Sequence, residues 1–128
     1  LSDLVRVKTT IRDNQYVQKN DILICARNGS RALVGKCALI SDFGEAASFG
    51  AFMAIYRTEY FEYIVHYLRS SFFRSVFDDS NSTAINQLTQ DMLKRAIVPF
   101  PPLSEQHRIA ETIEAMLIEL NQMQKSLN

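Results

Sequence analysis

Three prolines within four positions constrain this chain more than any other feature of its sequence. They lie in the segment Val98-Pro99-Phe100-Pro101-Pro102-Leu103. Each proline fixes its own φ at about −65° and disfavours helical backbone in the residue before it, so the segment should be extended and stiff. Ser104 then offers a side chain that can cap a helix, and Glu105 places a negative charge in its first turn. The order predicted is a globular part, a rigid connector and a helix.

An apolar heptad pattern occupies the residues after the prolines. Its six members recur at intervals of four and three, which is the repeat of helices that pack in coiled coils: Ile109, Ile113, Met116, Leu120, Met123 and Leu127. A helix over residues 104–126 would be roughly 35 Å long at ~1.5 Å per residue. We expect this face to pack against another helix. The alternative is that the helix folds back onto its own globular part.

Strand patterns come early in the chain. Asp21–Arg27 is almost continuously apolar, which favours a strand buried on both faces, and Ala32–Ile40 predicts its neighbour. The dipeptide Asn28-Gly29 favours a tight hairpin between them, with a possible bulge at Gly35. Residues 46–57 predict one or two further strands, and residues 96–98 a short last strand before the prolines.

Helix patterns follow the strands. Apolar residues recur on one helical face from Glu59 to about Ser70, with a further turn through Phe77. Thr89 is suited to cap a short helix that runs through Lys94. The aromatic residues of the apolar stretches are expected in the core: Phe49, Phe52, Phe61, Phe72, Phe73 and Phe77. The fold class predicted is α+β.

In this prediction a small β-rich globule, mixed or antiparallel, packs with helices and is followed by one long coiled-coil-type helix. The divisions are residues 1–98 for the globule, 99–103 for the proline connector and 104–128 for the helix. No apolar run reaches the ~18 residues that a membrane helix needs. The chain begins at Leu1 rather than at a methionine, which suggests either a piece of a longer protein or a processed chain.

The charges and reactive side chains favour binding over catalysis. The net charge is zero, but residues 1–36 carry seven Lys or Arg and three Asp, a net +4, and the remainder carries −4. A basic first part suits contact with phosphates. His66 and His107 belong to no metal-binding or nucleophile motif, and neither do Cys25 and Cys37, so we expect no enzyme activity. Both cysteines lie in apolar stretches and are expected as buried free thiols rather than a disulfide.

The best candidate for binding is the predicted hairpin turn. It brings together side chains that can contact base edges in a DNA major groove: Arg27, Asn28, Ser30 and Arg31. Cations that could hold phosphates around it are Lys19, Lys36 and Arg57. A second candidate is the polar loop with Asn81, Ser82 and Thr83, followed by Asn86 and Gln87. The alternative is that the turn residues only form a good turn, that the arginines only add solubility, and that the loop is ordinary surface.

Four segments, in this order, resemble the DNA specificity (S) subunits of type I restriction–modification enzymes. Residues 97–109, IVPFPPLSEQHRI, resemble the P-x-PP-L-x-EQ-x-x-I signature that ends a target recognition domain in that family. Residues 19–40 resemble its hairpin, residues 60–77 its central helix, and residues 82–102 its approach to the prolines. The resemblance covers roughly residues 19–127.

The resemblance implies a non-catalytic subunit that recognises part of a bipartite site in double-stranded DNA. Its long helix would dock methyltransferase (M) subunits, which themselves bind S-adenosylmethionine, so this chain would need no cofactor. The helix would also pack against a second copy or against the other half of an S subunit. The implied location is the prokaryotic cytoplasm, with no membrane contact. A whole target recognition domain is longer than this chain, which implies a fragment or a half-subunit. The alternative function is a protein–protein adaptor that uses the coiled-coil helix without touching DNA.

Overall fold

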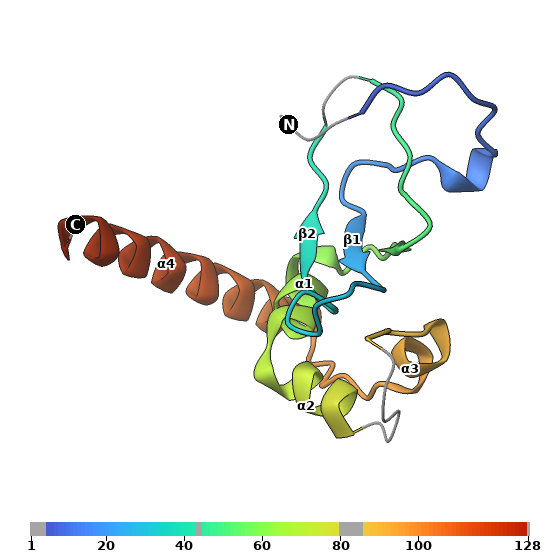
Figure 1. Cartoon of the computed structure of the whole chain (residues 1–128). Helices are drawn as coiled ribbons and strands as arrows, with labels where there is room; N and C mark the ends of the chain where they lie inside the picture. The colour runs from blue at the N-terminus through green and yellow to red at the C-terminus, as the bar shows by residue number, and fades with distance from the viewer. Residues whose placement is uncertain (1–4, 43–44, 80–85, 128) are drawn as a thin grey trace.

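A three-stranded antiparallel sheet lies at the centre of the computed structural model, which describes residues 5–42, 45–79 and 86–127. A short 3₁₀ turn, η1 (Asp13–Gln15), precedes it. The strands are β1 (Ile22–Cys25), β2 (Cys37–Leu39) and β3 (Met53–Tyr56), in the spatial order β2-β1-β3. The most apolar strand, β1, takes the middle position, and its Ile22 pairs with β2 on one side and with β3 on the other. The prediction of an α+β fold is confirmed (Figure 1).

The connection between β1 and β2 is longer than predicted. Asn28-Gly29 does not close a two-residue hairpin, because the Asn28 Oδ1 accepts a hydrogen bond from the Ser30 N–H at 2.8 Å and bends the backbone into a different turn. The positive φ falls instead at Gly35, at 87°. The Cys25 carbonyl accepts a hydrogen bond from the Gly35 N–H, and the Cys25 N–H donates to the Lys36 carbonyl. Gly35 and Lys36 on one strand therefore oppose the single residue Cys25 on the other. This arrangement is the bulge predicted at Gly35, and β2 begins only after it.

Three shorter helices follow the strands in the chain. They are α1 (Phe61–Arg69), α2 (Ser71–Asp79) and α3 (Gln90–Arg95). The predicted cap of α3 is confirmed, since the Thr89 hydroxyl accepts from the Met92 N–H at 3.1 Å. The buried apolar residues form one cluster: Ile22, Ile24, Val34, Ile64, Val65, Tyr67, Leu68, Phe73 and Leu88.

Two expectations about the globule are wrong. Phe52 and Phe72, both expected in the core, are 57% and 56% exposed. The predicted strand over residues 96–98 belongs to none of the three strands found among the described residues. This segment lies along α1, where the carbonyl of Ile97 accepts a hydrogen bond from the Tyr67 side chain and not from a neighbouring strand.

Tyrosines of α1 and its N-cap hold the proline segment. The Tyr67 hydroxyl donates to the carbonyl of Ile97 at 3.0 Å, and the Tyr63 hydroxyl donates to the carbonyl of Pro99. The ring of Tyr60 meets that of Phe100 edge to face, with centroids 4.8 Å apart. Burial raises the pKa of Tyr67, which keeps its hydroxyl protonated as a donor. The connector is therefore fixed to the globule and does not swing freely.

The long helix α4 (Leu103–Leu127) begins one residue before the cap predicted from the sequence. The Pro102 carbonyl accepts from the N–H groups of Glu105 and Gln106, at 2.9 and 3.0 Å. Ser104 therefore lies inside the first turn and is not its cap. The helix starts earlier because Pro102 cannot donate and its carbonyl is free to accept these bonds.

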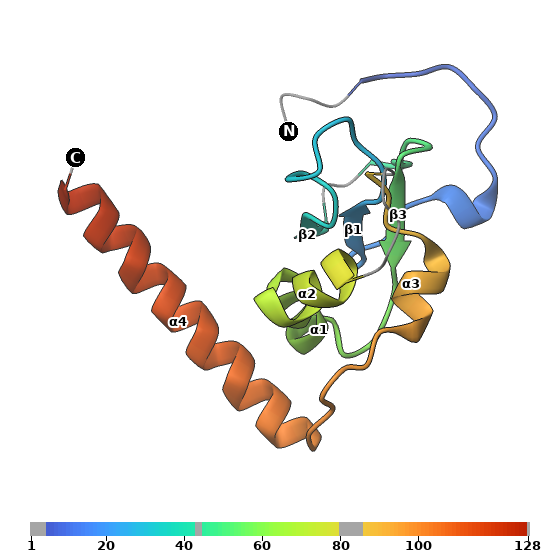
Figure 2. The same cartoon turned by 60° about the horizontal axis from the view of Figure 1, so that its bottom comes forward.

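The first half of α4 packs on α1, and the second half extends away from the globule (Figure 2). Gln106 and Ala110 are buried in this contact. Two histidine–glutamate contacts link the helices: His107 Nδ1 lies 3.1 Å from Glu62 Oε2, and His66 Nε2 lies 3.5 Å from Glu114 Oε1. The alternative that the helix folds back onto its own globule therefore holds for the first turns only.

Candidate DNA-recognition surface

Three segments that are far apart in the sequence meet beyond the C-terminal end of β1. On one side, the N–H groups of Ala26 and Arg27 donate to the Phe52 carbonyl at 2.9 and 3.1 Å. On the other side, Leu88 donates to the Ala26 carbonyl, and the next residues continue the pairing as an antiparallel bridge between Arg27 and Gln87. The predicted turn and the segment after the polar loop thus form one surface. The sequence had suggested them as two separate candidates.

The side chain of Arg27 is held on this surface by two neutral groups. Its Nη2 donates to the Gln87 Oε1 at 3.3 Å, and its guanidinium carbon lies 5.8 Å from the centre of the Phe52 ring. The Asn86 side chain donates to the Gly29 carbonyl at 2.9 Å and ties the two segments together. Arg27 is exposed, so its guanidinium is presented to solvent from a defined position.

The other predicted residues of the turn lie nearby. Ser30, Arg31 and Lys36 are exposed, whereas the Asn28 carboxamide oxygen is used in its own turn. The Arg31 backbone carbonyl accepts from Arg74 Nη2 at 3.0 Å, which anchors the connection to α2. Asn81, Ser82 and Thr83 lie outside the described residues.

A groove beside Lys36 adds cations to this end of the molecule. It has a volume of about 520 Å³ and runs between the start of β2 and the junction of α1 with α2. Its lining includes the basic side chains of Lys36, Arg69 and Arg74. Cys37 also lines it, and burial raises the pKa of this thiol. Lys36 and Arg69 give this groove positive charge, which is the charge that attracts phosphates.

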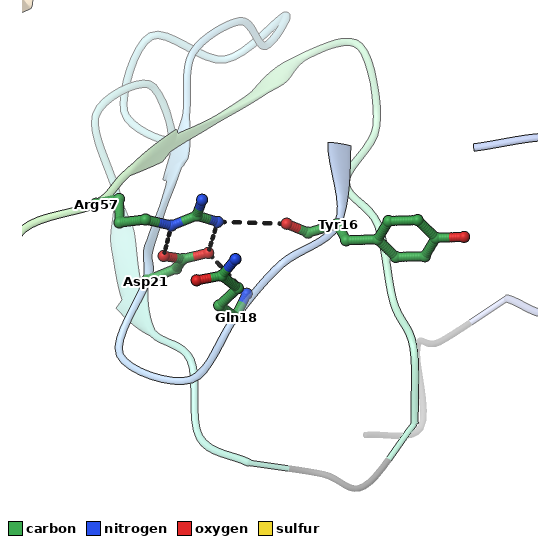
Figure 3. Close-up of polar contacts among 4 residues, drawn as sticks. All are labelled: Tyr16, Gln18, Asp21 and Arg57. Carbon is green, nitrogen blue, oxygen red and sulfur yellow. Dashed lines mark hydrogen bonds and ion pairs between the residues drawn. The ribbon is translucent and has the colours of Figure 1, made fainter. Parts of the chain in front are cut away.

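Lys19 and Arg57, the other predicted phosphate ligands, lie at the opposite end of β1. Arg57 binds the buried carboxylate of Asp21 through Nε and Nη2, each at 2.7 Å (Figure 3). Its Nη2 also donates to the Tyr16 carbonyl, and the Gln18 N–H donates to the same carboxylate. The hydrogen bond from Arg57 holds the pKa of Asp21 below its ordinary value. The charge of Arg57 is therefore balanced inside the protein.

The reactive side chains do not assemble into a site. Cys25 and Cys37 are free thiols, as predicted, but both are half-buried rather than buried. Cys37 pairs with Ile24, so Cys25 points to the other face of the sheet. Within the described ranges, no group of His, Cys, Asp and Glu side chains is placed to hold a metal ion. None of the described helices is long and apolar enough to cross a membrane.

The predicted packing face of the long helix divides into two parts. Ile109 and Ile113 are half-buried near α1. Beyond them the apolar residues are exposed, with Met116 at 57% and Leu127 at 87%. The exposed apolar members of this outer half are Met116, Leu117, Ile118, Leu120, Met123 and Leu127. Met116, Leu120, Met123 and Leu127, with Leu117 beside them, lie on one side of the helix, and we call these five residues the outer face of α4. Ile118 is exposed on nearly the opposite side.

Phe52 is the functional candidate that sequence reasoning missed. It lies in an apolar run and looks like a core residue, as Phe61 and Phe73 do. Only the pairing of Ala26 and Arg27 with the Phe52 carbonyl places its ring under the guanidinium. The sequence indicates Gln87 only as one of several polar residues after the loop, and nothing in its local sequence connects it with Arg27.

The structure is a small α+β domain with a long helix fixed to it, and the family comparison identifies its class as a DNA specificity domain. The chain belongs to the family of the type I restriction modification DNA specificity domain, whose family model matches residues 4–128. It is 34% identical over 125 residues to the StySPI specificity subunit of Salmonella potsdam, and 32% identical over 125 residues to the EcoKI specificity subunit of Escherichia coli strain K12. Each match covers 94% of this chain and 27% of the relative. No solved structure matches the chain.

Proposed function

We propose that this chain is a non-catalytic DNA sequence-recognition part of a type I restriction–modification complex. The observation that carries the proposal is the surface beyond β1, where the exposed Arg27 is held by the uncharged Gln87 and Phe52. The two specificity subunits to which the chain is similar support the same function. Because the chain spans about a quarter of their length, it would supply one part of a bipartite recognition.

In this proposal the turn after β1 contacts base edges. Arginine can donate two hydrogen bonds to O6 and N7 of guanine in the major groove, and amide and hydroxyl groups can contact neighbouring bases. Arg27, Asn28, Ser30 and Arg31 are the residues assigned to this role. Lys36 would hold a backbone phosphate next to them. Asn81, Ser82 and Thr83, which lie outside the described residues, are proposed as further DNA-contacting residues. Lys19 could contact DNA only from the other end of the sheet.

The long helix supplies assembly in this proposal. The outer face of α4 exposes five large apolar side chains along the far half of the helix, an arrangement that favours burial against another protein. We propose that it packs against methyltransferase subunits and against a second long helix, from another copy of the chain or from the other half of an S subunit. The chain would bind no cofactor, because S-adenosylmethionine would be bound by the methyltransferase.

The double variant Arg27→Ala with Arg31→Ala tests DNA recognition. We expect it to weaken binding of the target site by the assembled complex, since each base contact contributes ~1–3 kcal/mol. The measurement is methylation at the target site by the S subunit assembled with its methyltransferase subunits. The matched control is Arg95→Ala with Arg108→Ala, two exposed arginines of α3 and α4. Unchanged methylation in the double variant would show that this turn does not contact the bases.

The variant Leu120→Glu tests the assembly role of the helix. A charge in the middle of the outer face should prevent burial of the neighbouring apolar residues, so that the variant sediments as a smaller species than the unmodified chain. Asn121→Glu is the matched control, because it adds the same charge at the next exposed position outside the heptad stripe. Equal monomeric masses for Leu120→Glu and the unmodified chain would contradict self-association.

A further inference from the structure

Arg27 is positioned before any DNA arrives. Its backbone is fixed from both sides, by the Phe52 carbonyl on one and by the bridge to Gln87 on the other. Its side chain then contacts the same two residues, through the Phe52 ring and the Gln87 carboxamide. Backbone and side chain are thus held by one pair of neighbours.

The two neighbours orient the guanidinium without neutralising it. The Gln87 oxygen accepts one hydrogen bond, and an aromatic face attracts a cation through its quadrupole. Neither group carries a charge that would compete with a base or a phosphate. A guanidinium has five N–H donors in a planar fork, so a single bond to Gln87 leaves donors to meet a guanine. Ordering the long side chain in advance also removes part of the entropy cost of binding.

We infer that Phe52 and Gln87 are positioning residues that determine specificity by holding Arg27 at the angle needed for a guanine edge. The inference rests on the proposed function, because it assigns roles within the same surface. Phe52 supports the flat face of the guanidinium, and Gln87 fixes its rotation. A bidentate contact with O6 and N7 of guanine requires both the plane and the rotation of the guanidinium to be fixed. A single contact with a phosphate requires neither. The two residues should therefore affect discrimination between bases more than overall affinity for DNA.

The experiment uses the complete S subunit assembled with its methyltransferase subunits. Modified sites are mapped on genomic DNA, and methylation rates are compared between the target site and sites with one changed base pair. The variants are Phe52→Leu, which removes the ring, and Gln87→Ala, which removes the acceptor. Phe72→Leu is the matched control, since Phe72 is equally exposed but lies on α2 against Tyr67.

For Phe52→Leu and Gln87→Ala we expect discrimination at one base-pair position to fall by roughly threefold to tenfold. Discrimination at the other positions and binding to unrelated DNA should remain unchanged, as should every value for Phe72→Leu. A purely structural role would instead lower activity at all sites equally. Gln87→Glu provides a further test in case Phe52→Leu does not fold. It keeps the shape of the side chain but pairs Arg27 with a carboxylate, and it should relax the same position as Arg27→Ala does.

The outcomes separate the inference from the proposed function. If Arg27→Ala relaxes one position but Phe52→Leu, Gln87→Ala and Gln87→Glu leave it unchanged, the positioning role is wrong and the recognition surface stands. If Arg27→Ala also leaves every position unchanged, the turn after β1 is not the base-contacting element and the proposed function fails with it.

Discussion

Two arginines at opposite ends of β1 have opposite surroundings. Arg57 makes two 2.7 Å bonds to the carboxylate of Asp21, a residue that is only 1% exposed. Arg27 meets the oxygen of Gln87 and the ring of Phe52 instead. The sheet is the same, and both side chains reach the surface. The difference is that one cation balances an anion inside the protein while the other is held by neutral groups.

This difference separates stability from recognition. A buried carboxylate requires its partner, so Arg57 belongs to the fold even though sequence reasoning had placed it among the phosphate ligands. An arginine with neutral partners keeps its electrostatic field for an anion or a base edge. The partner of a cation is therefore more informative about its role than its exposure, because both arginines are at least partly exposed.

The largest effect is expected from Arg57→Ala. Removing the guanidinium leaves the buried Asp21 carboxylate without its ion pair. We expect the free energy of unfolding to fall by about 2–3 kcal/mol, less than for a fully buried pair because Arg57 is half-exposed. Urea unfolding at pH 7 measures it. A loss no greater than that of a surface substitution would show that solvent already compensates this carboxylate.

Acid should reduce the stability that the Arg57–Asp21 ion pair contributes. The folded-state pKa of Asp21 is lowered, chiefly by the hydrogen bond from Arg57. The stability that this supplies is present above the unfolded pKa of ~3.9 and is lost as the pH falls through the folded value. The gap in unfolding free energy between the unmodified chain and Arg57→Ala should therefore be widest at pH 7 and narrow below about pH 4. Urea midpoints at pH 7, 5 and 3 test this, and a constant gap would contradict it.

The smallest effect on stability is expected from Arg27→Ala. Its contacts are exposed and neutral, so the unfolding free energy should change by less than about 1 kcal/mol. The measurement is again urea unfolding at pH 7, beside Arg57→Ala. A loss as large as that of Arg57→Ala would mean that Arg27 holds the three converging segments together, and the contrast between the two arginines would disappear.

Long periodic elements could be predicted from the sequence. The heptad over α4, the apolar strand β1 and the Thr89 cap each depend on residues close in the chain. The structure confirms the helix, apart from its start, the strand and the cap. It buries one face of β1 fully and the other only partly. Local chemistry also indicated the bulge at Gly35. The same reasoning gave a wrong prediction for Asn28-Gly29. The Asn28 side chain forms a turn of its own there, and the two-residue hairpin predicted from this dipeptide is absent.

The candidate site was only partly predictable because its contacts are non-local. Arg27 and Gln87 are 60 residues apart, and no periodic pattern relates them. The same holds for Arg57, which is separated from Asp21 by 36 residues. Sequence reasoning could recognise side chains able to bind DNA. It could not tell which cations the fold would pair internally, since that depends on which strand ends meet.

The tyrosines of α1 that bind the proline segment have a mechanical consequence. Tyr63 and Tyr67 fix the connector, and the first turns of α4 rest on the same helix, so a single nine-residue helix sets the direction of α4. With 25 residues, α4 is about 37 Å long. A tilt of about 10° at its base would displace its far end by about 6 Å. Small changes in two phenol hydrogen bonds would thereby become displacements of several ångströms at the far end of α4.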